Sequence, residues 1–315
     1  MLCPICRLSC SFVDPEISVN SGQMFLWQKI DNSWYGVYGD HVLKFSTLEQ
    51  DKNPTDGIRN IQFLSYPEFN KWERHVFRLD DDFARILSSL SKDLILSKAI
   101  KMYRGLRLTR QEPEQCMISF ACASNTNISM IRRMLGNVCR KFGNRVTVDG
   151  REFFTFPTAN RLNRATNNEL LACGVGYRVK AIRAVVENIV SNNIDFKGLK
   201  LAKYNASKEE LMKIYGIGNK IADCVLLFSL EKTEAFPIDI WINRAICLHY
   251  HSVLPGNKEQ RKYREQQMPK MDEELVYRYK YEILSDVMRR YFGEYAGYAQ
   301  QYLYYYMRHK AARKW

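Results

Sequence analysis

The first fifty residues are rich in aromatic and β-branched side chains, and this pattern indicates β structure over residues 18–50. Residues 34–45 read Trp-Tyr-Gly-Val-Tyr-Gly-Asp-His-Val-Leu-Lys-Phe, so Gly39-Asp40 is expected to form a turn between two strands. Further along, an apolar stripe at helical spacing follows the acidic residues 80–82 and comprises Phe83, Ile86, Leu87 and Leu90. Acidic side chains stabilise the start of a helix, so a helix is predicted there.

Beyond residue 112 the pattern becomes almost wholly helical. Short turns separate predicted helices over residues 116–124, 128–142, 167–173, 178–190 and 208–213. A tyrosine-rich helix with a basic end is expected from Tyr291 to Trp315. Residues 258–270 are charged and poor in aliphatic side chains, which indicates an exposed loop or helix. The chain is therefore predicted to be an α+β protein, with a β-rich part over residues 1–112 and a helical part over residues 113–315.

The net charge of +13 is unevenly distributed along the chain of 315 residues. Residues 1–115 carry 15 basic and 15 acidic side chains, which leaves 32 basic and 19 acidic side chains for residues 116–315. A neutral part beside a basic part suggests a surface that binds a polyanion, most often nucleic acid. From charge alone, a solvated basic surface is an equally acceptable interpretation.

Neither a membrane segment nor a secretory signal is predicted. No apolar run approaches the roughly 20 residues that cross a bilayer, and the N-terminus lacks the long apolar stretch of a signal peptide. The nine cysteines are therefore expected to be reduced thiols inside a cell, in the nucleoid of a prokaryote or the nucleus of a eukaryote. Cys3, Cys6 and Cys10 lack a fourth partner at metal-binding spacing, so we expect neither a metal ion nor a cofactor.

The most informative stretch is residues 211–224, which read Leu-Met-Lys-Ile-Tyr-Gly-Ile-Gly-Asn-Lys-Ile-Ala-Asp-Cys. An amphipathic helix ends at Gly216-Ile217-Gly218 and a second helix begins at once, so residues 214–219 form a hairpin between two helices. Backbone N–H groups at the start of the second helix can bind a phosphate without reading a base. Gly216 and Gly218 are therefore predicted to bind DNA.

This stretch resembles the helix-hairpin-helix DNA glycosylases, whose hairpin runs Leu-x-Gly-Val-Gly-x-Lys-x-Ala. The resemblance places the catalytic lysine on Lys220. Nineteen residues later, Ala-Phe-Pro-Ile-Asp at residues 235–239 resembles the family's Val-Pro-Val-Asp and places the catalytic aspartate on Asp239. The alternative is a noncatalytic hairpin module, in which the lysine binds a phosphate and the aspartate caps a helix. Such modules lack the pairing of this lysine with this aspartate.

A lysine suits the expected chemistry once its amine is neutral. A free lysine is neutral in only roughly one molecule in 2,500 at pH 7, but burial or a neighbouring cation can make the amine available as a nucleophile. The amine can then attack the sugar C1′, displace the base and form a Schiff base, which nicks the strand by β-elimination. Asp239 would stabilise the cationic sugar-like transition state or deprotonate Lys220, and the sequence leaves both roles open.

Further matches, spread over about residues 18–310, resemble the 8-oxoguanine DNA glycosylases. Residues 220–224 match the family's Lys-Val-Ala-Asp-Cys, and Cys224 is expected to cover one face of the extruded base. Its alternative role is that of a buried apolar thiol. Residues 297–304 resemble Gly-Trp-Ala-Gln followed four residues later by Phe. Gln300 would then read the Watson–Crick edge and Tyr304 would stack on the base.

The N-terminal residues 21–27 read Ser-Gly-Gln-Met-Phe-Leu-Trp and resemble the family's Ser-Gly-Gln-x-Phe-x-Trp. The resemblance implies that the carbonyl of Gly22 accepts a hydrogen bond from N7–H, a donor that 8-oxoguanine has and guanine lacks. An unpaired buried carbonyl costs about 1–3 kcal/mol, which makes this discrimination physically sensible. A simple turn glycine is the alternative.

Two more segments resemble motifs of the family whose residues act on the DNA helix. Residues 122–127 resemble Cys-x-Ser-Asn-x-Asn, and residues 174–178 resemble Gly-x-Gly-Tyr-Arg. The resemblance implies that Asn125 fills the space left by the flipped base and that Tyr177 wedges into the opposite strand. Arg178, next to this tyrosine, is counted among the DNA-binding residues.

Two positions depart from the animal relatives. An arginine that reads the orphaned cytosine is replaced here by Met130, which cannot make bidentate hydrogen bonds. We therefore expect a relaxed preference for the base opposite the lesion. A phosphate-contacting histidine is replaced by Trp241. Since no cysteine follows Cys247, the four-cysteine iron–sulfur cluster of relatives that cut oxidised pyrimidines or mispaired adenine is excluded.

The resemblance thus implies a monomeric bifunctional glycosylase and abasic-site lyase that excises 8-oxoguanine from double-stranded DNA. The same enzyme acting on a different damaged purine, and a nonenzymatic DNA-binding module, are the alternatives. The implied fold has a small antiparallel sheet domain with helices, followed by two helical subdomains with the active site between them. The C-terminal helix is expected to return and line the pocket.

Overall fold

The N-terminal part of the chain forms an antiparallel sheet in the computed structural model, which describes residues 5–9, 12–47, 58–255 and 279–312. The strands pair in the order β1-β5-β4-β3-β2, with the bounds β1 Ile5–Ser9, β2 Trp27–Ile30, β3 Ser33–Tyr38, β4 His41–Thr47 and β5 Ile58–Tyr66. The turn predicted at Gly39-Asp40 is confirmed, because it joins β3 and β4 with Tyr38 paired to His41. Neither β1 nor β5 was expected from the sequence pattern.

The β structure predicted from residue 18 begins too early, because residues 18–20 belong to helix α1 (Pro15–Asn20). The side chain of Asp14 caps this helix by accepting a hydrogen bond from the backbone N–H of Ile17 at 3.0 Å. Pro15 at the first helical position has its φ already set for a helix. These local start signals outweigh the β-branched residues that follow.

Three helices complete the N-terminal part: α2 (Trp72–Val76), α3 (Phe83–Leu90) and α4 (Leu94–Met102). The predicted helix behind the acidic residues is confirmed as α3, with Asp82 as its N-cap. Helix α2 buries Trp72 and Val76 in a core of aromatic side chains from the sheet. Helix α2 therefore covers the sheet, whereas α4 packs against the C-terminal helix of the chain.

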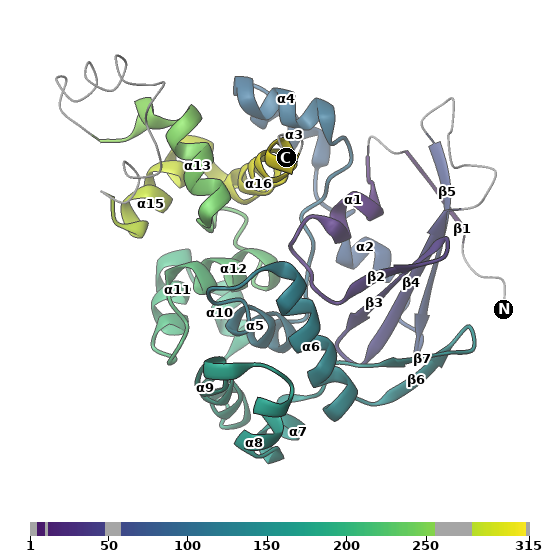
Figure 1. The fold of residues 1–315 in the computed structure, drawn as a ribbon. Coiled ribbons are helices and arrows are strands. Elements are labelled where there is room, and N and C mark those ends of the chain that lie inside the picture. The colour runs from purple at the N-terminus through teal and green to yellow at the C-terminus, as the bar shows by residue number, and fades with distance from the viewer. Residues whose placement is uncertain (1–4, 10–11, 48–57, 256–278, 313–315) are drawn as a thin grey trace.

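The second part of the chain is mainly helical (Figure 1). Its helices are α5 Pro113–Ala121, α6 Ile128–Phe142, α7 Ala159–Arg164, α8 Asn167–Ala172, α9 Val179–Val190, α10 Phe196–Leu201, α11 Tyr204–Met212, α12 Asn219–Ser229, α13 Ile240–His249, α15 Tyr281–Phe292 and α16 Ala296–Ala312, with short 3₁₀ turns η2 Gly176–Arg178, η3 His251–Val253 and η6 Gly293–Tyr295. The five helices predicted after residue 112 correspond to α5, α6, α8, α9 and α11 within a few residues at each end.

A two-stranded hairpin interrupts this region, which the sequence pattern had indicated to be almost wholly helical. Strands β6 (Arg145–Val148) and β7 (Arg151–Phe154) pair across a turn in which Asp149 and Gly150 both have positive φ. An Asp-Gly pair between β-branched and aromatic residues is a strong hairpin signal, so the sequence did contain it. The hairpin packs against the sheet, and the hydroxyl of Tyr35 donates to Asp149 at 2.6 Å.

The C-terminal helix also differs from its predicted bounds. Helix α15 ends at Phe292, and Gly293 adopts a φ of +67, which ends one helix before α16 starts at Ala296. The helix predicted from Tyr291 is therefore two helices with a break between them. Residues 313–315 and the segment 258–270 lie outside the described residues.

The two parts of the chain share one hydrophobic core. Helix α16 packs against α4 of the first part and against α13 and α15 of the second (Figure 1). The side-chain amide of Gln301 in α16 donates to the carbonyl of Ser21 at 2.9 Å, and the hydroxyl of Tyr298 donates to Asp81 at 2.5 Å. The C-terminal helix thus returns to the N-terminal part, and the division at residue 112 remains a prediction.

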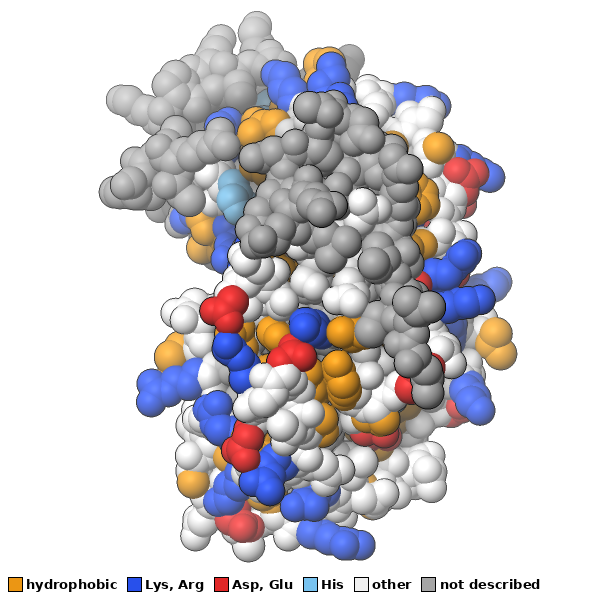
Figure 2. All heavy atoms as spheres, turned by 90° about the vertical axis from the view of Figure 1, so that its right-hand side faces the viewer, with side chains coloured by type: hydrophobic (Ala, Val, Ile, Leu, Met, Phe, Trp, Pro, Cys, Tyr) orange, Lys and Arg blue, Asp and Glu red, His pale blue; other side chains and the backbone are white. Residues whose placement is uncertain are grey.

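Among the described residues, no helix is both long and apolar enough to cross a lipid bilayer. Figure 2 shows Lys and Arg side chains over the lower part of the face that it draws, with acidic side chains between them. Charged side chains of the described residues form surface pairs, such as Arg145 with Glu152 at 2.8 Å and Arg151 with Asp31 at 2.7 Å. Exposed pairs of this kind contribute little to stability.

Candidate active site

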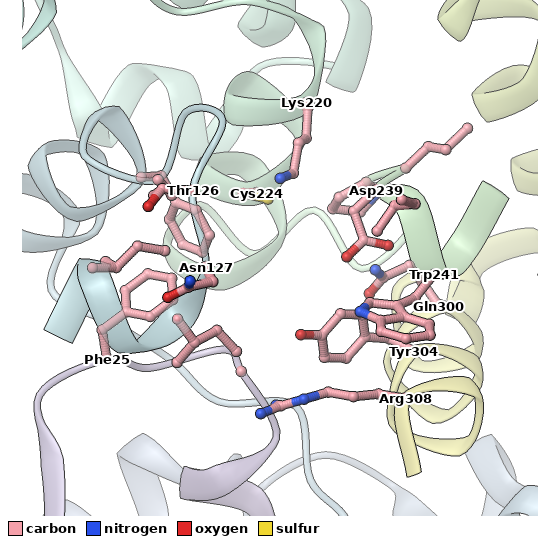
Figure 3. A pocket seen from close by; sticks show the side chains of 18 of the residues that line it. Phe25, Thr126, Asn127, Lys220, Cys224, Asp239, Trp241, Gln300, Tyr304 and Arg308 are labelled. Carbon is pink, nitrogen blue, oxygen red and sulfur yellow. The ribbon is translucent and has the colours of Figure 1, made fainter. Parts of the chain in front are cut away.

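A cavity of about 870 Å³ lies where α12, α13 and α16 meet the segments around Gly22 and Asn125 (Figure 3). Most of the site residues predicted from the sequence line this cavity: Gly22, Asn125, Lys220, Cys224, Asp239, Gln300 and Tyr304. The remaining predicted residues do not line it: Tyr177, Arg178, Gly216 and Gly218. The fold therefore brings the predicted catalytic and base-recognition residues into one cavity, although they come from opposite ends of the chain.

The hairpin between α11 and α12 presents Lys220 to the cavity. Gly216 has a φ of +85, and a Cβ at this position would lie 2.3 Å from the Cβ of Ala181 in α9, so only glycine fits. Gly218 has an extended backbone and caps α12 without a side-chain hydrogen bond. Lys220 follows in the first turn of α12, where its exposed side chain projects its amine into the cavity (Figure 3).

Asp239 lies on the facing wall, at the N-cap of α13. Its carboxylate accepts a hydrogen bond from the backbone N–H of Ile242 at 2.9 Å and points into the cavity on the side opposite Lys220 (Figure 3). Burial raises the pKa of the Asp239 carboxyl above its ordinary value, while the Ile242 N–H and the charge of Lys220 act in the opposite direction. The aspartate is therefore both a helix cap and a cavity residue.

Cys224 and Gln300 form part of the cavity wall. Cys224 is 4% exposed, and burial raises the pKa of its thiol to about 12, so it offers a neutral and polarisable surface. Gln300 is 5% exposed, and its side-chain carbonyl oxygen has no hydrogen-bond partner among the described residues. A buried acceptor without a donor costs about 1–3 kcal/mol. The cavity is therefore suited to a ligand that donates a hydrogen bond to Gln300.

The segment around Gly22 is held beside the C-terminal helix by hydrogen bonds of the neighbouring Gln23. Gly22 has a φ of +85, and a Cβ there would lie 2.9 Å from the hydroxyl oxygen of Tyr304. The neighbouring Gln23 is fully buried, donates to the carbonyl of Arg107 at 2.8 Å and accepts from the backbone N–H of Thr109 at 2.8 Å. These bonds fix the glycine backbone against the tyrosine ring.

The predicted DNA-binding residues Asn125, Tyr177 and Arg178 are neighbours in space. Asn125 is exposed and adopts a φ of +45, a conformation that asparagine tolerates better than most residues. The hydroxyl of Tyr177, whose side chain is 64% exposed, donates to the carbonyl of Ser124 at 3.1 Å. The guanidinium of Arg178 donates to the carbonyls of Ser124, at 2.5 and 3.0 Å, and of Asn125, at 3.2 Å.

Several further residues line the cavity without a role assigned from the sequence, among them Phe25, Trp241 and Arg308. Phe25 packs edge-on against Phe120, with ring centroids 5.3 Å apart. Arg308 extends below Tyr304 in Figure 3. Burial raises the pKa of the Tyr304 hydroxyl to about 12, and the charge of Arg308 acts in the opposite direction. Its spacing of four residues from Tyr304 and eight from Gln300 places all three on one helix face, a signal that could have identified it.

In the part of the chain that the structure describes, no three His, Cys, Asp or Glu side chains are grouped to hold a metal ion. The cysteines whose side chains are described there are free thiols. Cys6 belongs to β1, whereas Cys3 and Cys10 lie outside the described residues.

Two family models match the chain. Residues 7–117 match the N-terminal domain of 8-oxoguanine DNA glycosylase, and residues 118–270 match the HhH-GPD superfamily base excision DNA repair protein. A probable N-glycosylase/DNA lyase of Methanothermobacter thermautotrophicus is 30% identical over 275 residues, which is 80% of either chain. The N-glycosylase/DNA lyase of Saccharomyces cerevisiae is 36% identical over 64% of this chain and 56% of the yeast protein.

A solved structure agrees over nearly the whole length. The 8-oxoguanine glycosylase/lyase of Clostridium acetobutylicum, in complex with double-stranded DNA containing cytosine opposite 8-oxoguanine, has a TM-score of 0.79 and 25% identity, and covers 99% of each chain. The predicted α+β fold is therefore confirmed. Together with the family models and the archaeal relative, this similarity shows that the chain belongs to the 8-oxoguanine DNA glycosylases of the HhH-GPD superfamily, a family of DNA glycosylases with lyase activity.

Proposed function

We propose that this protein excises 8-oxoguanine from duplex DNA with Lys220 as the nucleophile and Asp239 as its partner. The observation that supports this most is that both groups project into one cavity from facing walls (Figure 3). The same cavity is lined by the residues to which the resemblance assigns base recognition: Gly22, Cys224, Gln300 and Tyr304. A noncatalytic hairpin module would not require this arrangement.

The damaged nucleotide must leave the helix to reach the cavity, which costs a few kcal/mol. Tyr304 and Cys224 would contact the two flat faces of the base, since aromatic and polarisable side chains suit a π-face. The unpaired carbonyl oxygen of Gln300 would accept a hydrogen bond from the Watson–Crick edge. The carbonyl of Gly22 would accept from N7–H, so guanine would leave it unpaired at a cost of about 1–3 kcal/mol.

The chemical steps follow from the amine of Lys220. In its neutral form the amine attacks C1′, the bond from C1′ to N9 breaks, and the bonding electrons leave with the base. Opening of the sugar ring then gives a Schiff base between Lys220 and C1′. Loss of a proton from C2′ and departure of the 3′-phosphate nick the strand. Asp239 in its ionised form would accept the proton of Lys220 or stabilise the positive charge on the sugar.

The surroundings of the cavity suit duplex DNA. The N-terminus of α12 has no side-chain cap, so its N–H groups are available to a phosphate at the hairpin. Asn125 would occupy the space of the flipped nucleotide, and the exposed Tyr177 would enter the opposite strand. Arg178 would act by holding both in place, because its guanidinium donates to the carbonyls of Ser124 and Asn125 and lies over the Tyr177 ring.

The base opposite the lesion would be read only weakly. Met130 stands where the animal relatives have an arginine, its side chain is 41% exposed, and it has no group that can make a bidentate hydrogen bond. We also propose that the protein acts as a monomer in the compartment that holds the DNA, which is the nucleoid of a prokaryote or the nucleus of a eukaryote.

Borohydride trapping tests this function. Wild type and Lys220→Gln are each incubated with a duplex that contains one 8-oxoguanine, and borohydride reduces any Schiff base to a stable adduct. An adduct with wild type alone supports both the lesion and the nucleophile. Release of the free base without an adduct would refute the lysine mechanism. If neither appears, the lesion is wrong, and duplexes with other damaged purines distinguish the alternatives.

A further inference from the structure

Asp223 is a buried carboxylate for which the proposed chemistry has no use. It lies on α12 three residues after Lys220 and immediately before Cys224, within the motif that resembles Lys-Val-Ala-Asp-Cys. Its side chain is fully buried and does not line the cavity. Burying a charge is costly unless it is paired and hydrogen-bonded, so its partners indicate what it is for.

The partners of Asp223 come from the helices on either side of α12. From α11, the hydroxyl of Tyr204 lies 2.5 Å from the carboxylate and the ammonium of Lys208 lies 3.0 Å from it. From α15, the hydroxyl of Tyr281 donates at 2.7 Å, and that of Ser285 lies at 3.5 Å. Asp223 therefore fixes α12, the helix of Lys220, to α11 and to α15.

The contacts from α15 continue to the segment that carries Asp239. The oxygen of Tyr281 accepts a hydrogen bond from the backbone N–H of Ile238 at 3.1 Å, and Ile238 directly precedes Asp239. The hydroxyl of Ser285 lies 3.3 Å from the carbonyl of Phe236 in the same segment. Burial, and the nearby carboxylate of Asp223, raise the pKa of Tyr281, so its hydroxyl keeps the proton that it donates.

We propose that Asp223 is a positioning residue, which fixes the segment ending in Asp239 relative to the helix of Lys220 through the hydroxyl of Tyr281. This inference rests on the proposed function, because it concerns the two residues assigned to the chemistry. Lys220 lies one helical turn before Asp223, and Asp239 lies one residue after the peptide held by Tyr281. The two walls of the cavity are thus joined behind it by a chain of two hydrogen bonds.

Such a link matters because the reaction depends on geometry. Lys220 and Asp239 belong to different helices, and no helical hydrogen bond fixes the distance between them. A misplacement of about 1 Å can cost about 100-fold in rate. The ion pair with Lys208 offsets the burial of Asp223, but a buried ion pair adds little net stability. We therefore assign the main role of the network to placement rather than to stability.

The test is Tyr281→Phe in the full chain, since this change keeps the ring and removes only the hydroxyl. Single-turnover excision of 8-oxoguanine at saturating enzyme should slow by about 10- to 100-fold, while the affinity for an uncleavable duplex stays unchanged. The acid limb of the rate profile should move to lower pH, because a loosened segment exposes the half-buried Asp239 further to water and lowers its pKa. Asp223→Asn should shift both measurements in the same direction, and the two changes should combine less than additively.

Tyr35→Phe is the matched control. Like Tyr281, Tyr35 donates its hydroxyl to a carboxylate, that of Asp149, at 2.6 Å, but it lies in the sheet and not at the cavity. The excision rate and the pH profile of Tyr35→Phe should equal those of wild type. A folded Tyr281→Phe with the rate and pH profile of wild type would overturn the positioning role, whether or not its melting temperature falls. An adduct formed by Lys220→Gln would instead refute the proposed function.

Discussion

Tyr304 occupies the space beside Gly22 into which any other residue would place its side chain. A Cβ on Gly22 would lie 2.9 Å from the hydroxyl oxygen and 3.0 Å from the ring carbon Cε1 of Tyr304. Real Cβ atoms essentially never approach so closely, and the φ of +85 at Gly22 also disfavours a side chain. One wall of the cavity is therefore formed where the start of the chain meets its last helix.

We expect Gly22→Ala to slow 8-oxoguanine excision by about 10-fold or more, because the added methyl group displaces Tyr304 or the glycine carbonyl. The positive φ should also cost about 1 kcal/mol of stability. Gly150→Ala is the control, since Gly150 also has a positive φ but a Cβ there would meet nothing within 4 Å. It should lose similar stability and keep its excision rate. Equal rates for the two variants would contradict the role of Gly22.

Gln300→Leu should slow excision by about 10- to 100-fold, the value of one or two hydrogen bonds to the base. Its melting temperature should stay the same or rise, because the change removes a buried carbonyl oxygen that no described residue donates to. The neighbouring Gln301→Leu loses its hydrogen bond to the carbonyl of Ser21 and should melt at a lower temperature. Thermal melting and single-turnover kinetics measure both effects. Strong destabilisation by Gln300→Leu would show that its carbonyl is paired.

Asp239→Asn should greatly reduce excision and trapping while preserving the helix cap, since asparagine is also a good N-cap. In wild type, burial raises the pKa of Asp239 in the folded state. Its ionisation therefore destabilises the protein as pH rises through that pKa, and the relative stabilisation is present only below it. The variant should melt higher than wild type at neutral pH, and this difference should shrink as the pH falls. A difference that is independent of pH would contradict the burial effect.

The wild-type excision rate should fall as the pH drops through the raised pKa of Asp239, because either proposed role requires the ionised carboxylate. The midpoint should lie above the ordinary aspartate value of about 3.9. Single-turnover rates measured across a pH series test this. A rate that stays constant below neutral pH would exclude ionised Asp239 from the rate-limiting step.

Met130→Arg should restore a preference for cytosine opposite the lesion. A guanidinium can make the paired hydrogen bonds that methionine cannot, and one such pair discriminates by about 1–3 kcal/mol. The ratio of the excision rates opposite cytosine and opposite adenine should rise by about 10-fold or more. Met130→Leu controls for the loss of the methionine itself and should keep the wild-type ratio. A wild-type ratio in Met130→Arg would place this side chain away from the opposite base.

Arg308→Gln and Arg178→Gln should behave differently. The guanidinium of Arg308 lies at the cavity, so its loss should lower the salt dependence of DNA binding by about one counterion. Arg178 donates to backbone carbonyls of the chain itself, so its loss should reduce stability and leave the salt dependence unchanged. Affinities measured over a range of salt concentrations decide this. A smaller salt dependence in Arg178→Gln would instead place its guanidinium on a DNA phosphate.

The sequence by itself determined the elements that depend on neighbouring residues. The apolar spacing of α3 and α6, the turn at Gly39-Asp40 and the hairpin before Lys220 all arise from contacts within one or two turns of the chain. Such periodicities determine which face is apolar, whatever the element later packs against. Motifs spread along the chain also pointed to seven of the residues that line the cavity, although not to how they meet.

The tertiary structure decided what depends on residues far apart. Strand β5 pairs with β1 on one side and with β4 on the other, and local spacing does not determine which strands it pairs with. The contact of Gly22 with Tyr304 and the hydrogen bonds from Asp223 through Tyr281 to Ile238 join segments that have no fixed separation along the chain. A side chain's partners are set by packing and by the need to satisfy buried polar groups, and both exist only once the chain has folded.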